Sequence, residues 1–365
     1  FVFLFSYKYI GGYMKRFYFL ISICFMLMLV PSCVCASDIF SNYIVMDMES
    51  GRVFYEKASD EKRLPASTTK IMTLVVGLEN SNLSDVVRVG DEILTMDGSN
   101  IYVEIGENIL MQDLMYGMIL RSGNDASMVI AKNAGGTVDN FVKLMNEKAR
   151  SLGLENTVFN NPSGLDDYEK NITTVRDLSL IYRYGYRNKI FRDIVGSKTY
   201  SSSSDKKSYY FVNRSKIINM DKRITGAKTG YTPDAGRVLV SSASNGDLDV
   251  VISSISKIDY GYGEHINFYN SVFSKYRKYM ILDKYHFDVN SNFKGKLYIK
   301  NSFSYPVSSE EKDKIDKKIV YNGKKDGVVG EVLVYLDSDL IHKERIYLKK
   351  DKISFFDRIK AFFGV

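Results

Sequence analysis

Residues 64–73 read Leu-Pro-Ala-Ser-Thr-Thr-Lys-Ile-Met-Thr, and this stretch decides how we interpret the rest of the chain. Apolar residues then recur at helical spacing up to about Leu78, which predicts a helix that begins just after Pro65. Ser67 and Lys70 would lie about one turn apart on one face of that helix. A serine hydroxyl becomes a nucleophile when a base takes its proton, and a lysine with a lowered pKa can be that base.

The Ser-x-x-Lys spacing alone is weak evidence, because a chain rich in serine and lysine produces it by chance. Six other serines have a lysine at the same spacing: Ser59, Ser203, Ser204, Ser254, Ser291 and Ser309. On this spacing alone, the N-cap of the helix is the better interpretation of Ser67. Other parts of the chain have to decide between the two interpretations.

The composition is that of an ordinary globular protein. The chain has 365 residues, of which 45% are hydrophobic and 25% charged. This length suits one large and one smaller domain. The net charge of +7 does not indicate a nucleic-acid partner, because the lysines alternate with acidic residues. A polyanionic envelope or a membrane surface accounts for the excess equally well.

The N-terminal residues resemble an export signal. Lys15 and Arg16 precede an apolar run over residues 17–30, and short side chains follow at 34–36. We therefore expect residues 1–36 to comprise upstream residues and a cleaved signal peptide. An uncleaved membrane anchor is the alternative, although the apolar run is short for a span. The protein would then act outside the cytoplasmic membrane, at its outer face or in the cell wall.

Cysteine and histidine are placed where they exclude several kinds of site. The three cysteines all fall in the signal segment: Cys24, Cys33 and Cys35. The three histidines are far apart: His265, His286 and His342. The mature protein would have no disulfide and no thiol nucleophile, and a histidine-based triad or zinc site is not indicated. We expect neither a metal nor a cofactor.

Hydrophobic periodicity outlines the order of the elements. A hairpin is expected over 43–55, and helices over 108–120, 126–133, 138–152, 175–186 and 264–279. A second hairpin is expected over 237–255, with Asn245-Gly246 as a two-residue type I′ turn. Short strand-like segments follow from 287 to 348. The pattern predicts a helical middle region, a sheet, and then a small β domain.

Two further motifs support the catalytic interpretation of Ser67. Ser122-Gly123-Asn124 lies in a predicted break between helices, and Lys228-Thr229-Gly230 on a predicted strand before a hairpin. Together with Ser-x-x-Lys, in this order, they form the motif set of penicillin-binding proteins and class A β-lactamases. Order, spacing and structural context agree for all three motifs.

The sequence around these motifs resembles that of the low-molecular-weight penicillin-binding proteins that act as D-alanyl-D-alanine carboxypeptidases, the S11 family of serine peptidases. The matching phrases are 64–73, 122–126, Asn-Pro-Ser-Gly-Leu-Asp at 161–166, and 228–232. The resemblance implies a mixed α/β fold, in which a central antiparallel sheet and a helical subdomain are followed by a small all-β domain. We place the catalytic domain at 37–282, the β domain at 283–348 and an amphipathic tail at 349–365. Ser163 stands where the family often has histidine.

The resemblance and the chemistry together assign the catalytic roles. Ser67 would attack the carbonyl of the penultimate D-alanine of a peptidoglycan stem peptide, with Lys70 as the base. Lys228 would help to keep that amine neutral. Ser122 would pass the proton to the leaving D-alanine, and Asn124 would hold Lys70 and the substrate amide.

Substrate binding is assigned to the third motif and the residue after it. Lys228 and Thr229 would bind the terminal carboxylate, and Gly230 would let the peptide lie close to the strand edge. The backbone N–H groups of Ser67 and Tyr231 would form the oxyanion hole. β-Lactam antibiotics would act as covalent inhibitors at Ser67.

Several acidic and basic residues near the motifs have less certain roles. Asp125, Asp166 and Asp167 are interpreted as loop and cap residues rather than as catalytic acids. Lys257 is a candidate for a second cation at the substrate carboxylate.

Three other functions remain open from the sequence. A β-lactamase would need a second base, and the usual Glu-x-x-Leu-Asn is absent. A transpeptidase or a DD-endopeptidase could use the same site. A non-catalytic wall-binding protein would be expected to have lost the serine or the lysine.

The C-terminal residues have the pattern of an amphipathic helix. One helical face gathers apolar residues: Ile353, Phe355, Phe356, Ile359, Phe362 and Phe363. The opposite face is mostly charged, so the segment fits a helix lying in a membrane interface. A helix docked on the β domain is the alternative.

Deleting residues 350–365 should therefore release the protein from membranes without loss of penicillin labelling. Fractionation of cells that express the full and the truncated protein, followed by labelling, measures both. If the truncated protein stays with the membranes although its signal peptide is cleaved, the anchor lies elsewhere.

Overall fold

The computed structural model describes residues 39–94, 96–166, 170–289, 293, 295–324 and 326–349. The expected signal segment, Asp167 and residues 350–365 of the expected C-terminal helix lie outside these ranges. Within them, none of the helices combines the length and the apolar character needed to cross a bilayer.

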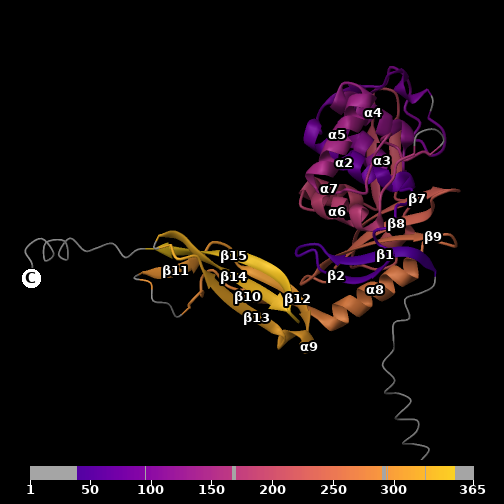
Figure 1. Cartoon of the computed structure of the whole chain (residues 1–365). Coiled ribbons are helices and arrows are strands. Elements are labelled where there is room, and N and C mark those ends of the chain that lie inside the picture. Colours follow the sequence, from indigo (N-terminus) through magenta and orange to yellow (C-terminus); the bar gives the residue numbers. More distant parts are fainter. Residues whose placement is uncertain are drawn as a thin grey trace, which may run out of the picture. The chain divides into compact units, whose positions relative to one another are not determined.

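The centre of the catalytic region is a five-stranded antiparallel sheet (Figure 1). Its strands lie in the order β2 (Val53–Lys57), β1 (Phe40–Asp47), β9 (Asp249–Ser256), β8 (Gly236–Ser244) and β7 (Ile224–Thr232). The first two strands are the N-terminal hairpin, so the sheet joins residues from both ends of the catalytic region. The strand that bears Lys228-Thr229-Gly230, β7, is the last in this order and has one edge that no strand of this sheet covers.

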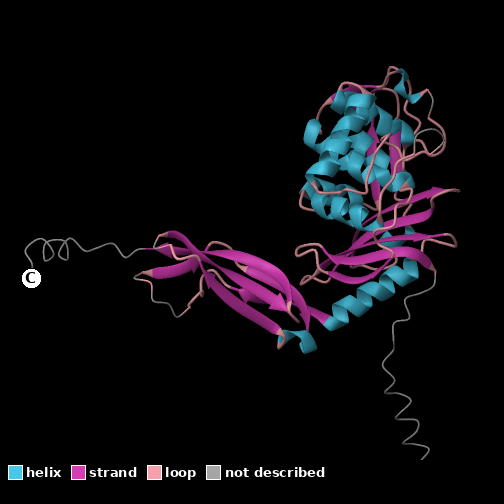
Figure 2. Cartoon of the chain, viewed as in Figure 1, coloured by secondary structure: helices cyan, strands magenta, loops and turns pink. Residues whose placement is uncertain are grey.

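Helices pack on both faces of this sheet (Figure 2). Val45 and Ile252 pack on one face against Phe268 and other residues of α8 (Tyr262–Lys275). Ile44, the neighbour of Val45, belongs to the larger core on the other face. Neighbouring strand residues point to opposite faces, so central strands covered on both sides must be apolar at successive positions.

The larger core is formed with the helices of the middle region. These are α2 (Lys70–Asn80), α3 (Met111–Leu120), α4 (Asn124–Gly135), α5 (Val138–Ser151), α6 (Val175–Gly185) and α7 (Lys189–Gly196). Short 3₁₀ turns lie at η1 (Ala66–Thr69), η2 (Asp91–Ile93) and η3 (Lys216–Asn219). The same part of the chain also contains two small antiparallel pairs of strands. These are β3 (Val86–Arg88) with β4 (Asn108–Leu110), and β5 (Thr199–Ser203) with β6 (Ser208–Val212).

Side-chain caps explain where two of these helices begin. The side chain of Thr137 accepts a hydrogen bond from Asn140 N before α5, and that of Thr174 accepts one from Asp177 N before α6. Each cap satisfies an amide that has no partner inside the helix. These two caps fix the first residues of α5 and α6.

The C-terminal part is a small β domain with a core of its own, as expected. Its strands are β10 (Tyr276–Leu282) paired with β12 (Phe303–Ser308), and a sheet in the order β11 (Lys296–Ile299), β15 (Asp339–Lys349), β14 (Gly327–Leu336) and β13 (Ile315–Tyr321). A single turn, α9 (Ser309–Lys312), follows β12. A separate apolar cluster that includes Val329, Val334 and Ile346 fills it. The boundary proposed after residue 282 stays a prediction.

Three local predictions were wrong. The helix expected from residue 108 begins at Met111, because residues 108–110 pair with β3. The helix expected to reach residue 279 ends at Lys275, because the following residues pair with β12. In both places the apolar residues recur at helical spacing, but pairing with a strand distant in sequence makes the residues extended.

The third difference is the turn between β8 and β9. Asn245 N donates to Leu248 O, so the two central residues are Gly246 and Asp247 rather than Asn245 and Gly246. Only Gly246 has a positive φ, of 89°, whereas a type I′ turn needs a positive φ at both central residues. The hairpin itself is confirmed.

Candidate active site

Ser67 lies in the 3₁₀ turn η1, one turn before the start of α2 at Lys70. The turn is closed by the carbonyl of Pro65, which accepts hydrogen bonds from Thr68 N at 3.1 Å and from Thr68 Oγ1 at 2.6 Å. Ala66 has a φ of 47°, a left-handed conformation that a residue with a side chain adopts at a cost of about 1–2 kcal/mol. The chain thus changes direction sharply just before Ser67.

The Lys70 amine is fully buried and hydrogen-bonded to three oxygens. Its Nζ lies 3.0 Å from Ser67 Oγ, 2.7 Å from Asn124 Oδ1 and 2.6 Å from the carbonyl oxygen of Ser163. Burial lowers the pKa of Lys70 well below its usual range, and the positive charge of Lys228 lowers it further, against an opposite effect of Asp125. In its neutral form, this amine has a lone pair for the Ser67 proton.

A second buried amine lies across the cleft. Lys228 Nζ donates to Ser122 Oγ at 2.9 Å and to the Thr229 carbonyl at 2.6 Å. Burial lowers the pKa of Lys228 to about 7, with a further contribution from the positive charge of Arg214. Ser122, in the break between α3 and α4, has a φ of 64°. Two serines and two lysines from three separate motifs therefore meet at one place.

Two glycines allow the backbones around Ser67 to approach closely. A Cβ on Gly230 would lie 2.9 Å from Ser67 N and 3.0 Å from the Pro65 carbonyl oxygen. A Cβ on Gly164 would lie only 1.9 Å from the Ala66 carbonyl oxygen, and Gly164 has a φ of 85°. Strand β7 and the loop that carries Ser163 can both contact the Ser67 turn only because these side chains are absent.

Asn124 is held by the loop that precedes α3. Its Nδ2 donates to the Asp97 carbonyl at 2.6 Å, and its backbone N donates to the Ser99 carbonyl at 2.7 Å. The next residue, Asp125, accepts from the backbone N–H groups of residues 101–103 at 2.7–3.2 Å. Asp125 is thus a loop-binding residue, as expected.

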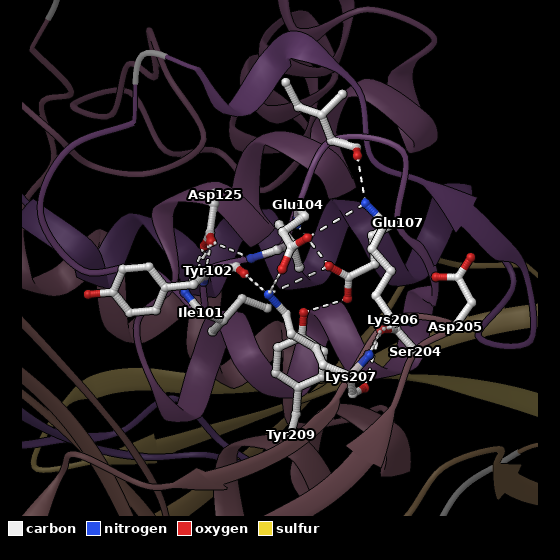
Figure 3. A network of polar contacts seen from close by, with 12 residues as sticks. Ile101, Tyr102, Glu104, Glu107, Asp125, Ser204, Asp205, Lys206, Lys207 and Tyr209 are labelled. Carbon is white, nitrogen blue, oxygen red and sulfur yellow. Dashed lines mark hydrogen bonds and ion pairs between the residues drawn. The ribbon is translucent and has the colours of Figure 1, made fainter.

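A polar network fixes the same loop from the outside (Figure 3). Lys207 Nζ donates to the Tyr102 carbonyl at 2.5 Å and to Glu104 Oε1 at 2.9 Å. It also lies 3.9 Å from the fully buried carboxylate of Glu107, which accepts from Tyr209 Oη at 2.5 Å. The β5–β6 hairpin is thereby joined to the loop on which Asn124 depends.

The remaining acids have structural partners or lie outside the structure. Asp166 Oδ2 accepts from Thr232 Oγ1 at 2.6 Å, which joins the 161–166 loop to the end of β7. Asp167 is not among the described residues.

His265 is part of the core rather than of a catalytic group. It is fully buried between Ser241 Oγ, 2.7 Å from Nδ1, and Ser254 Oγ, 2.8 Å from Nε2. Burial lowers the pKa of His265 to about 3. Ser254 belongs to one of the chance Ser-x-x-Lys matches, and its burial keeps any substrate away from it.

Residues from each of the three motifs line one cleft of about 960 Å³. Its lining includes Ser67, Ser122, Thr229, Gly230 and Tyr231. Lys257, the suggested second cation, is not among the described residues that line it.

Sequence reasoning missed Arg214, which lines this cleft. Its Nη1 donates to Ser99 Oγ at 2.5 Å, and its charge acts on Lys228. No motif and no periodicity marks this arginine, which lies between β6 and η3. Arg214 is therefore a better candidate than Lys257 for the second cation.

Comparison with known proteins agrees with this geometry. The family model described as D-alanyl-D-alanine carboxypeptidase, peptidase S11, matches residues 36–257. The chain belongs to this family. Peptidase S11 members therefore share with it the region that holds all three motifs.

Individual relatives support the same assignment. D-alanyl-D-alanine carboxypeptidase DacF of Bacillus subtilis is 33% identical over 214 residues, which are 57% of this chain and 55% of DacF. DacC of Escherichia coli is 34% identical over 225 residues, 57% of this chain and 54% of DacC. The chain thus spans about half the length of the curated relatives it matches. The crystal structure of penicillin binding protein 5 from Haemophilus influenzae is similar with a TM-score of 0.73 and 25% identity, over 86% of this chain and 97% of that one.

The pKa of Lys228 predicts how substrate binding depends on pH. With a pKa of about 7, the amine is charged below pH 7 and neutral above it, and only the charged form attracts a carboxylate. KM for a peptide ending in D-Ala-D-Ala should then rise about fivefold between pH 7 and pH 8 if only that form binds. In Lys228→Arg, which stays charged, this rise should disappear. An identical rise in the arginine variant would assign the titration to another group.

The network in Figure 3 predicts a role for Lys207 at a distance from the cleft. Lys207→Met leaves the buried Glu107 without its cation and should lower the free energy of unfolding by about 1–3 kcal/mol. It should also slow penicillin acylation, because the loop that holds Asn124 loosens. Lys206→Met is the matched control, since Lys206 Nζ bonds the Ile105 carbonyl and Glu104, but not Glu107, among the described residues. Equal effects of both changes on the acylation rate would contradict the role of Glu107.

Proposed function

We propose that this protein is a serine-type D-alanyl-D-alanine carboxypeptidase that removes the terminal D-alanine from peptidoglycan stem pentapeptides. The observation that carries the proposal is the buried Lys70 amine, with its lowered pKa, 3.0 Å from Ser67 Oγ. A buried lysine amine with a lowered pKa, placed at this distance, can take the proton of the serine hydroxyl.

The first chemical step is acylation. Ser67 Oγ attacks the carbonyl carbon of the penultimate D-alanine while Lys70 Nζ takes its proton. The negative charge on the carbonyl oxygen is stabilised by the backbone N–H groups of Ser67 and Tyr231. When the C–N bond breaks, the proton that Lys70 took from Ser67 passes by way of Ser122 Oγ to the nitrogen of the leaving D-alanine, so Lys70 is neutral again. Lys228 Nζ donates a hydrogen bond to Ser122 Oγ. The product is an ester on Ser67.

The substrate would add to the uncovered edge of β7 as an antiparallel strand. Its terminal carboxylate then meets Lys228, Thr229 and Arg214, while Asn124 holds the peptide amide and Lys70. Gly230 leaves room for the peptide backbone against the strand. Hydrolysis of the ester by water completes the reaction, whereas attack by an amine of another stem would make the enzyme a transpeptidase.

The expected N-terminal signal and the expected C-terminal helix bear on where the protein works. We propose that the protein is exported by its N-terminal signal and works outside the cytoplasmic membrane, where its substrate lies. The C-terminal amphipathic segment would hold it at the membrane surface. Both segments rest on sequence pattern alone.

Mass analysis of products tests this function directly. A pentapeptide ending in D-Ala-D-Ala should lose one alanine. Cross-linked products would favour a transpeptidase, cleavage of cross-linked dimers an endopeptidase, and rapid release of hydrolysed penicillin a β-lactamase. Failure to bind labelled penicillin covalently would favour a non-catalytic wall-binding protein.

Two substitutions test the nucleophile and its base. Ser67→Ala should abolish covalent labelling by penicillin in a protein that remains folded. Lys70→Arg should slow acylation at least about 10²-fold although the charge is kept, because arginine cannot be deprotonated. The acylation rate and the circular dichroism of each variant provide the measurement. Labelling that survives Ser67→Ala, or a wild-type rate in Lys70→Arg, would contradict the assigned role.

A further inference from the structure

The oxygens around the Lys70 amine determine the direction of its lone pair. In the neutral form the amine has two N–H donors and one lone pair. Asn124 Oδ1 and the Ser163 carbonyl oxygen lie 2.7 and 2.6 Å from Nζ, and both can only accept a hydrogen bond. The third oxygen, Ser67 Oγ at 3.0 Å, belongs to a hydroxyl and can also donate. When the first two oxygens take both N–H donors, the lone pair is left for the Ser67 proton.

The Ser163 carbonyl belongs to a loop that side chains hold in place. Residues 161–166 form neither helix nor strand. Asn161 Oδ1 accepts from Ser163 N at 3.2 Å, so the loop folds around its own side chain. Thr73 Oγ1 donates to the Pro162 carbonyl at 2.7 Å, which joins the loop to α2. The direction of the Ser163 carbonyl therefore depends on hydrogen bonds made by side chains.

Asn171 joins this loop to η1, the turn before α2. It is 2% exposed, and its side chain makes four hydrogen bonds. Oδ1 accepts from the backbone N of Asn160 at 2.7 Å and of Asn161 at 3.1 Å. Nδ2 donates to the Asn161 carbonyl and to Thr69 Oγ1, both at 3.0 Å. Thr69 is the residue directly before Lys70, so one buried amide connects the start of the loop to the neighbour of the base.

None of these four bonds leads to the place where a substrate binds. Asn171 is not among the described residues that line the cleft, and its partners are groups of the loop and of η1. Both segments reach Lys70: the loop provides the Ser163 carbonyl, and η1 provides the Ser67 hydroxyl. An effect of Asn171 on the reaction therefore has to act through the groups that surround the amine.

We propose that Asn171 is a positioning residue that directs the lone pair of Lys70 at the Ser67 hydroxyl. It does so through the Ser163 carbonyl, whose loop it holds against η1. This inference rests on the proposed function, since it takes Lys70 as the base. When the loop moves away, an N–H of the amine turns toward Ser67 Oγ, and the lone pair points away from the proton that it should take. A misplacement of about 1 Å can lower a rate by up to about 10²-fold.

Rapid-mixing kinetics with benzylpenicillin test this role in the full chain. The dependence of the acylation rate on penicillin concentration separates the first-order acylation rate constant from the dissociation constant of the noncovalent complex. In Asn171→Ala the acylation rate constant should fall about tenfold, because the base is misdirected. The dissociation constant should stay within about twofold of wild type, because the residues that line the cleft are unchanged.

Two further variants separate positioning from a general loss of stability. Asn42→Ala is the matched control, because Asn42 is fully buried on β1 and its side chain also makes four hydrogen bonds, none with a residue that bonds the Lys70 amine. Its free energy of unfolding should fall as in Asn171→Ala, with the acylation rate constant within about twofold of wild type. Thr69→Val removes only one of the four bonds of Asn171 and should give an intermediate rate constant.

Several results would overturn the proposal. One is an unchanged acylation rate constant in Asn171→Ala, or in Thr69→Val if Asn171→Ala does not fold. Another is an equal loss in Asn171→Ala and Asn42→Ala, and a third is a change confined to the dissociation constant. If penicillin does not acylate the wild-type protein, the proposed function fails and this inference fails with it. Acylation of the wild type together with unaffected variants would refute this inference alone.

Discussion

The burial of the Lys70 amine is the constraint on which the rest of the active site depends. A lysine removed from water is tolerated when its amine is hydrogen-bonded, and here the three oxygens around it come from three different segments. Ser67 supplies one from the preceding turn, Asn124 one from the start of α4, and Ser163 one from a loop. The amine is fully hydrogen-bonded only when these three segments come together.

Close backbone contacts help to set the position of Ser67, the proposed nucleophile. Gly164 and Gly230 let two segments come against the turn that carries Ser67, so the amides near Ser67 are fixed by β7 as well as by the helix. The loop before α3 performs the same task for Asn124, and it is fixed in turn by Asp125 and by the β5–β6 hairpin. The contacts of Lys207 thus connect the loop that holds Asn124 to a hairpin outside the cleft.

The sequence predicted those parts of the site that depend on the identity of side chains. Ser67, Lys70, Ser122, Asn124 and Lys228 were named from three motifs, and the structure brings them together; their catalytic roles stay proposals. The carbonyl of Ser163 was missed as an acceptor for Lys70, because a backbone oxygen has no letter in a sequence. Arg214 was missed because it is an isolated arginine whose neighbours come from other segments of the chain.

The same distinction holds for the fold. The sheet, the helical region and the β domain follow from periodicity, since their core faces repeat along the chain. Residues 108–110 and 276–279 were assigned to helices because their strand partners, β3 and β12, are not neighbours in the sequence. Hydrophobic periodicity depends on residues close together in the sequence, so it does not predict pairing with a distant strand.

The two buried lysines also couple folding to protons. In the unfolded chain both amines have an ordinary lysine pKa and are charged at neutral pH, whereas in the folded protein the pKa of Lys228 is about 7 and that of Lys70 is well below the usual range. The unfolded state therefore binds more protons from about pH 7 up to the usual lysine pKa, and the free energy of unfolding increases with pH in that window. The protein accordingly releases protons as it folds, because both amines hold fewer protons in the folded state in this pH window.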